Sequence, residues 1–212
     1  MIYGLAEITK DVRVALDMNM SGEQLTAIAD VDTLALDDII RSKVCDAIKN
    51  VETNAPIHLV EGRKSLNREI VWNEDEQTCY MVLPSDFMRL VVFRMSDWER
   101  AVHSAITVAD PLYALQSSKL RGIRGNPQKP VCAEVLNEKG KVLEIYSCRD
   151  TDSTVKEGKY LPLPSIENGK VEISPRCYRA VVYMTAALTA SALSDNNKSA
   201  ALTALAEAEL KS

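Results

Sequence analysis

Residues 79–94, CYMVLPSDFMRLVVFR, decide how this chain folds, because they place one β-prone run on each side of a proline. The first run is predicted to end at Leu83, since Pro84 has no N–H to donate to a strand ladder. Asp86 can bind nearby backbone amides and so favours a turn. Phe87 then returns the chain to the core. We therefore expect two strands joined by a turn at the Pro-Ser-Asp sequence.

A second turn is predicted just downstream, where Asp97 and Trp98 follow the second run. We expect the large indole of Trp98 to anchor this turn in the core. Arg94 and Arg100 would then be free to pair with acidic side chains. A loop packed against a sheet accounts for these residues without any catalytic role.

Short β-prone runs extend on both sides of this stretch, over residues 57–173. They are IHLV, REIVW, TCYMVL, RLVVFRM, PVCAEVL and KVLEIYS. Turn-forming Gly, Asn and Pro residues lie between them, and Asn-Glu-Lys-Gly between the last two runs predicts a β-hairpin. Strands this short and this closely spaced predict a small antiparallel sandwich or barrel rather than βαβ units.

Both ends of the chain are predicted to be helical. Residues 1–56 contain one apolar helical repeat that begins near Ile8 and a stronger one over about 33–53, which Asp32 or Thr33 could cap. Residues 174–212 begin with Ser174-Pro175, a favourable cap and first helical position. A break at residues 194–197 separates a helix that ends near residue 193 from a last helix over 199–210.

The two helical ends are expected to pack together. Ten alanines lie between Ala180 and Ala208, and small side chains let helices approach closely. We therefore predict an α+β protein in which the segments 1–56 and 174–212 form a helical bundle around a central β-rich region, 57–173.

Composition excludes several classes of protein. The 212 residues carry a net charge of −5, and the first sixty hold ten acidic and five basic residues. This balance argues against a globally basic nucleic-acid binder. Five cysteines without a C-x-x-C pair indicate reduced, mostly buried thiols of a protein that matures inside a cell. The start of the chain shows no secretory signal. The most apolar run, AVVYMTAALTASAL, is shorter than the roughly 20 residues of a membrane span.

The sequence offers little that predicts catalysis. His58 and His103 have no metal-ligating partner at suitable spacing, and the common nucleotide-binding, hydrolase and zinc motifs are absent. The acidic run 74–76 could bind a divalent cation together with Asp86, but charged turns are more often solvated. We expect no enzymatic activity, no cofactor and no metal.

The chain has one basic stretch without acidic residues, formed by Lys119, Arg121, Arg124 and Lys129 among glycines and prolines. Such a loop can contact phosphates without reading bases. Alternatively, it is a surface loop that docks on an acidic neighbour, such as the N-terminal helices of another copy. The second interpretation fits the uneven charge better.

The stretch around residues 79–102 resembles the head–tail connector proteins of short-tailed bacteriophages, the adaptor or tail-tubular family that docks under the portal. The matching residues are Tyr80, Leu83, Pro84, Asp86, Phe87, Arg89, Leu90, Trp98 and Arg100. The order of parts is also similar to that family, with N-terminal helices, an inserted β region and an alanine-rich helical pair near the end of the chain.

The resemblance implies a virion structural protein, made in the host bacterial cytoplasm, with no catalytic role and no membrane contact. It implies a homo-oligomeric, dodecameric ring in which one face of a protomer binds a different face of the next. The helices would pack around the ring and against the portal protein, the β region would meet the next tail component, and genomic DNA would pass through the lumen. The alternatives are another tail ring or capsid-associated protein, and a cellular α+β module that binds protein or nucleic acid through the basic loop.

Overall fold

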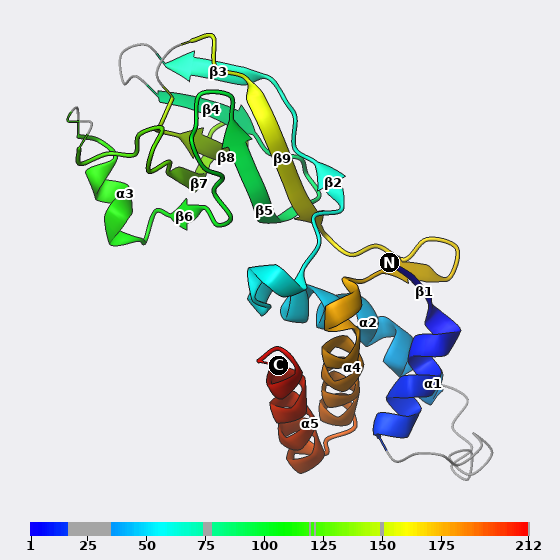
Figure 1. Cartoon of the computed structure of the whole chain (residues 1–212). Helices are drawn as coiled ribbons and strands as arrows, with labels where there is room; N and C mark the ends of the chain where they lie inside the picture. The colour runs from blue at the N-terminus through cyan, green and yellow to red at the C-terminus, as the bar shows by residue number, and fades with distance from the viewer. Residues whose placement is uncertain (17–34, 74–77, 119, 121, 149–150, 212) are drawn as a thin grey trace. The chain divides into compact units, whose positions relative to one another are not determined.

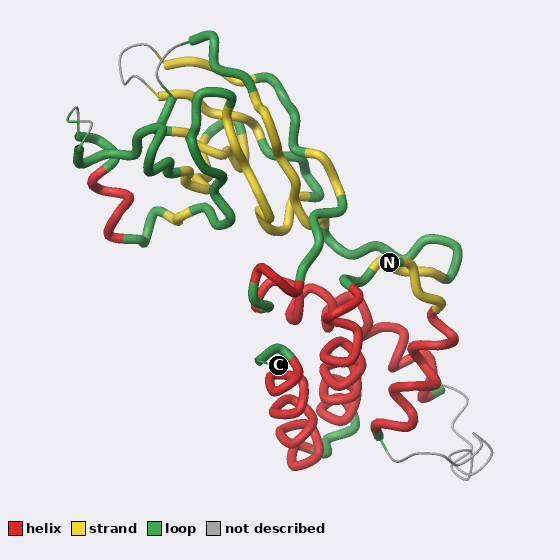
Figure 2. The backbone as a smooth tube through the Cα atoms, viewed as in Figure 1, coloured by secondary structure: helices red, strands yellow, loops and turns green. Residues whose placement is uncertain are grey.

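The computed structural model describes residues 1–16, 35–73, 78–118, 120, 122–148 and 151–211 (Figure 1). Two compact units are present. Residues 1–60 and 164–212 form the first, which we name the helical unit, and residues 61–163 form the second, which we name the β unit. The predicted α+β class is confirmed, with helices from both ends of the chain and sheets in the middle (Figure 2).

The helical unit has α4 at its centre, in contact with α1, α2 and α5. Its elements are β1 (Ile2–Gly4), α1 (Leu5–Ala15), α2 (Leu36–Asn54), η2 (Ile57–Leu59), β10 (Lys170–Glu172), η3 (Pro175–Cys177), α4 (Tyr178–Ala192) and α5 (Asn196–Glu209). Alanines at positions 180, 186, 187 and 190 of α4 are almost fully buried, which is how this helix accommodates three neighbours. β10 lies within the range predicted to be β-rich, yet it pairs with β1 in this unit.

The predicted apolar face of α2 is confirmed, while some helix ends differ from the prediction. Ile40, Val44 and Ile48 of α2 are fully buried, as its periodicity predicts. The proposed caps at residues 32 and 33 lie outside the described residues. The last helix begins at Asn196 rather than at residue 199, because the Asp195 side chain accepts a hydrogen bond from Lys198 N at 3.0 Å and caps it earlier.

The start of α4 also differs from the prediction. The Ser174 side chain makes no capping hydrogen bond, and a short 3-10 turn precedes the helix. Instead, the backbone N–H of Ser174 donates to Oε1 of Glu52 at 2.8 Å, and Glu52 is fully buried on α2. A carboxylate from the first half of the chain therefore fixes the entry into the second half.

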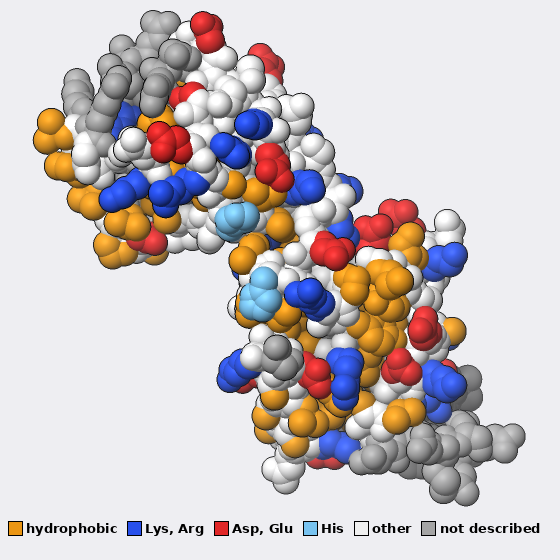
Figure 3. All heavy atoms as spheres, in the orientation of Figure 1, with side chains coloured by type: hydrophobic (Ala, Val, Ile, Leu, Met, Phe, Trp, Pro, Cys, Tyr) orange, Lys and Arg blue, Asp and Glu red, His pale blue; other side chains and the backbone are white. Residues whose placement is uncertain are grey.

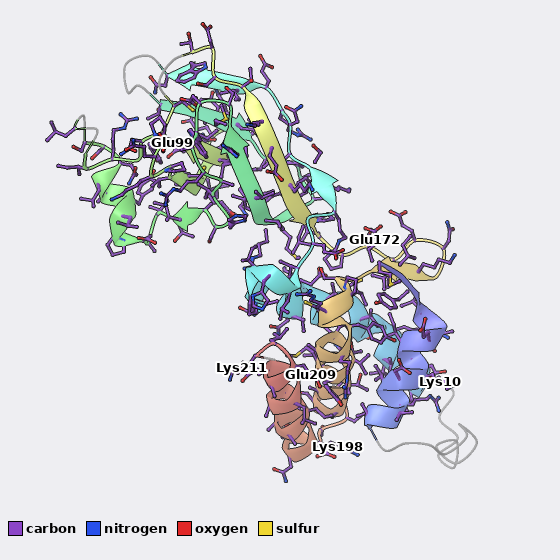
Figure 4. All side chains as sticks on the ribbon, in the orientation of Figure 1. Lys10, Glu99, Glu172, Lys198, Glu209 and Lys211 are labelled. Carbon is purple, nitrogen blue, oxygen red and sulfur yellow. The ribbon has the colours of Figure 1, made fainter. Side chains whose placement is uncertain are left out.

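Polar contacts between helices complete this unit. Lys198 Nζ donates to the carbonyl of Leu16, just past the end of α1, at 2.6 Å. Arg179 on α4 lies 3.6 Å from Glu209 on α5. Lys198 and Glu209 are labelled in Figure 4, at opposite ends of α5. No helix among the described residues has both the length and the apolar character to cross a membrane.

The β unit contains two sheets and a short helix. One sheet has the order β3 (Ile70–Asn73), β4 (Thr78–Val82), β8 (Gly140–Ile145), β7 (Cys132–Asn137) and β6 (Ile106–Thr107), and the other has the order β2 (Lys64–Ser65), β9 (Val155–Pro162) and β5 (Phe87–Met95). The helix is α3 (Pro111–Leu115). All pairs are antiparallel except β6 with β7.

Side chains from both sheets share one hydrophobic core, so the unit is a sandwich. The core residues are Leu66, Cys79, Met81, Leu83, Phe87, Leu90, Phe93, Met95, Trp98, Cys132, Leu143, Ile145 and Tyr160. The described strands of the β unit form two separate sheets and no closed barrel. The predicted hairpin is confirmed, because β7 and β8 pair up to Asn137 and Gly140.

Two strand predictions need correction. The predicted strand over residues 57–60 is replaced by the 3-10 helix η2, because the Leu59 N–H donates back to the carbonyl of Pro56 at 3.0 Å. β9 was absent from the predicted runs, since its first half is mostly charged and contains Gly158. This strand nevertheless pairs with both β2 and β5 and holds the smaller sheet together.

Candidate functional site

The Pro-Ser-Asp turn carries the chain from the larger sheet to the smaller one. β4 ends at Val82 and β5 begins at Phe87, whose N–H donates to the Pro84 carbonyl at 3.0 Å. The predicted turn is therefore present. Leu83 is buried, and its N–H donates to the Lys141 carbonyl at 2.9 Å, which ties the turn to the start of β8.

Asp86 joins three strands of the smaller sheet at this turn. Its Oδ2 accepts from Lys64 Nζ at 2.6 Å and its Oδ1 accepts from Tyr160 OH at 2.9 Å. Its backbone carbonyl accepts from Leu163 N at 2.7 Å. One residue thus links β2, the start of β5 and the end of β9.

The electrostatics of the turn favour an ionised Asp86. The hydrogen bond from Lys64 lowers the pKa of this carboxyl, and the bond from Tyr160 acts in the same direction. Burial raises the pKa of the Tyr160 hydroxyl, and the hydrogen bond to Asp86 raises it further. Both carboxylate oxygens accept hydrogen bonds from the same protein, so the arrangement is structural. We name Asp86, Lys64 and Tyr160 the Asp86 clasp.

Aromatic packing completes the Asp86 clasp. The Phe87 and Tyr160 rings stack with centroids 5.4 Å apart. Lys141 Nζ lies 4.8 Å from the centroid of the Phe87 ring, close enough for a cation–π interaction. The acidic run 74–76, which we considered as a metal site with Asp86, lies outside the described residues. Within the described residues, no three potential metal ligands cluster.

The second predicted turn is built around Trp98. This side chain is only 2% exposed and meets Phe93 edge to face at 5.7 Å. Within the described part of the chain, Arg94 forms no ion pair with an acidic side chain, unlike the expectation. Its Nε donates to the Trp98 carbonyl and its Nη2 to the Glu99 carbonyl, each at 3.2 Å, so it fastens the turn through the backbone. Figure 4 labels Glu99 in this part of the β unit.

Of the remaining motif residues, Tyr80 lies on β4, Arg89 and Leu90 lie on β5, and Arg100 lies beyond the end of β5. Leu90 is buried, Arg89 is half-buried and Arg100 is exposed. Tyr80 on β4 bonds through its hydroxyl to Lys139 Nζ, which also lies 4.8 Å from the ring centroid. The structure thus gathers Leu83, Phe87, Leu90 and Trp98 into one core. These four motif residues therefore contribute to the stability of the sandwich.

One residue of the basic stretch lies inside the β unit. Arg124 is only 8% exposed, and its Nη2 donates to the Tyr146 carbonyl at 3.0 Å. It is therefore a structural anchor and is not presented to a phosphate. Lys129 is exposed, whereas Lys119 and Arg121 lie outside the described residues.

Sequence reasoning missed the residues that position α3. Gln116 is buried, donates to the Leu112 carbonyl at 2.8 Å and accepts from Gly125 N at 2.9 Å. Tyr113 OH donates to Glu144 at 3.2 Å. The helix starts at Pro111 with Asp110 as its cap, a pattern that could have revealed it. These polar contacts hold a helix that has no buried residue of its own.

The five cysteines are free in the structure. Cys79, Cys132 and Cys177 are buried, while Cys45 and Cys148 are half-buried. Burial raises the pKa of the Cys132 thiol well above its usual value. Such thiols are poor nucleophiles, so their environment favours packing over chemistry.

No known protein family matches the chain, and the curated proteins contain no significant relative.

Proposed function

We propose that this chain is a subunit of a head-to-tail connector ring of a bacteriophage, docking on the portal and joining it to the tail. The subunit would act by assembly, without catalysis or a cofactor. Rings of this kind need heterologous contacts, in which one face of a copy binds a different face of the next.

One observation carries the proposal. Both ends of the chain build a single helical unit, and a β-sandwich is inserted between them at residues 61–163. This is the layout that the resemblance implies, and the motif residues Leu83, Phe87 and Trp98 all lie in the sandwich core. The motif thus serves as the internal framework that an inserted domain requires.

The geometry of the basic loop disfavours the alternative of a nucleic-acid binding module. That alternative needs Arg124 on the surface, where it can contact phosphate. In the structure this guanidinium is buried against the Tyr146 carbonyl. Another tail ring or a capsid-associated protein is a closer alternative, and the position of the chain in the particle separates the two.

The proposal is tested by capture from the native source. A copy with an affinity tag is expressed there, its complexes are isolated, and their members are identified by mass spectrometry. We expect portal and tail proteins to co-purify in fixed ratio with the tagged chain. Recovery of only cellular enzymes or nucleic acid would refute the connector role. Recovery of capsid proteins without portal would favour the capsid-associated alternative.

A further inference from the structure

The β unit carries an exposed apolar surface around α3. We name it the α3 surface and define it by five large side chains whose exposed fractions lie between 45% and 65%: Val108, Leu112, Leu115, Leu120 and Ile123. Figure 3 shows hydrophobic side chains gathered over α3, at the end of the β unit. Exposed apolar side chains grouped in this way mark interaction sites more often than scattered ones do.

The surface is held in place by polar groups behind it. Gln116 and Tyr113 bond inward to Gly125 and Glu144. Arg124 bonds inward to the Tyr146 carbonyl. The short helix therefore reverses the usual pattern, with hydrogen bonds on its inner side and leucines on its outer side. A fixed backbone that displays leucines lowers the entropic cost of binding a partner.

The charge of this region points to an acidic partner. Residues 111–130 contain four basic residues and no acidic one. Arg124 is buried, so the charge offered to a partner comes from Lys119, Arg121 and Lys129. The chain holds a segment of the opposite kind: residues 17–34 contain four acidic residues, no basic one, and six large apolar residues, namely Met18, Met20, Leu25, Ile28, Val31 and Leu34. This segment lies outside the described residues. Its composition complements the α3 surface in both charge and apolar character.

We propose that the α3 surface binds residues 17–34 of a second copy of this chain. The inference rests on the proposed function, because a ring requires each copy to offer two different faces to its neighbours. The β unit would supply one face and the acidic segment of the next copy the other. A phosphate backbone fits this surface less well than the acidic segment, because it would leave the exposed apolar side chains without apolar contacts.

Isotope-coded photo-crosslinking tests the contact in the full-length chain. A ¹⁵N-labelled copy carries Val108→p-benzoylphenylalanine, and an equal amount of unlabelled protein lacks the probe. After irradiation and trypsin digestion, we expect the ¹⁵N probe peptide joined to the unlabelled peptide Val14–Arg41, which contains the acidic segment. Joining only to the ¹⁵N form of that peptide would mean binding within one copy and would overturn the proposal. Joining to any other peptide, or no joining at the highest soluble concentration, would also overturn it.

Matched substitutions measure the contribution of the leucines. Leu112→Ser with Leu115→Ser is expected to lower the mixed crosslink at least about tenfold, the factor that corresponds to about 1.4 kcal/mol. Leu136→Ser is the control, because Leu136 is 80% exposed on β7 and lies outside the α3 surface. This substitution should leave the yield of the mixed crosslink unchanged. Equal losses in both variants would refute a specific surface. Raised salt should weaken the crosslink, since part of the attraction is between charges.

The result is separable from the fate of the proposed function. Connector rings that form without this crosslink would remove the contact and leave the function standing. A mixed crosslink in a protein that never captures portal or tail proteins would leave the contact and remove the function.

Discussion

The Asp86 carboxylate shows how one residue of the motif acts in the fold. It binds Lys64 and Tyr160 at 2.6 and 2.9 Å while its backbone holds Leu163. Asparagine has only one acceptor oxygen, so it cannot accept both of these hydrogen bonds. The aspartate in the resemblance motif therefore has a structural explanation that needs no ligand.

The charge of Asp86 predicts a pH effect on stability. Because the folded pKa of this carboxyl lies below its unfolded value of about 3.9, its contribution is present above that pH and is lost as the pH falls through the folded pKa. We expect Asp86→Asn to lower the free energy of unfolding by about 1 kcal/mol at neutral pH, since Lys64 is largely exposed. Urea titrations at several pH values measure this difference in the free energy of unfolding between the two proteins. The difference should disappear in acid. Glu138→Gln, at the exposed β7–β8 turn, is the control, and a difference independent of pH would contradict the Asp86 clasp.

Two buried aromatics are predicted to dominate the stability of the sandwich. Trp98→Ala and Phe87→Ala should each cost roughly 3 kcal/mol or more, because each leaves a cavity in a shared core. Thermal and chemical denaturation, with Leu136→Ala as an exposed control, measure the loss. Unchanged stability of either variant would show that its ring is not part of the core.

At the scale of elements, a close approach between β2 and β9 fixes the smaller sheet. Gly158 on β9 faces the backbone just past β2, where an added Cβ would lie 2.1 Å from the Leu66 carbonyl oxygen. The same glycine accepts a hydrogen bond from Leu66 N at 2.8 Å. No side chain fits there without displacing one of the strands.

Gly158→Ala is therefore expected to destabilise the protein by about 2 kcal/mol, the usual cost of overpacking. Gly122→Ala is the matched control, since nothing lies within 4 Å of its added Cβ and its backbone angle is ordinary. Guanidinium denaturation of both variants gives the comparison. Alanine at an unstrained glycine lowers the entropy of the unfolded chain, so Gly122→Ala should keep or slightly raise the stability. An equal loss of stability in both variants would contradict the role of the close approach.

The sequence predicted those elements that depend on residues close to one another in the chain. The α2 face follows from its periodicity, and the β7–β8 hairpin follows from its turn. β9 escaped prediction because its place is decided by β2 and β5, both distant in sequence. The candidate site divides in the same way: the turn at Pro84 was predictable, while the burial of Arg124 depends on Tyr146, 22 residues further on.

At the scale of the whole molecule, the two units have separate cores. All core residues of the sandwich fall between Leu66 and Tyr160. We therefore expect residues 61–163, expressed alone, to unfold cooperatively, with a midpoint close to that of the sandwich in the full chain. Circular dichroism in the near ultraviolet, where both Trp72 and Trp98 contribute, measures this. A fragment without a cooperative transition would mean that the sandwich needs the helical unit to fold.

The central claim, that this chain is a connector subunit, is tested most directly by locating it in assembled particles. A copy with a C-terminal tag is incorporated in the native source, and purified particles are labelled with tag-binding gold and imaged by cryo-electron microscopy. The account predicts gold at a single vertex, between head and tail, with density of a ring at that level. Gold distributed over the shell, gold at the distal tail, or unlabelled particles would contradict it.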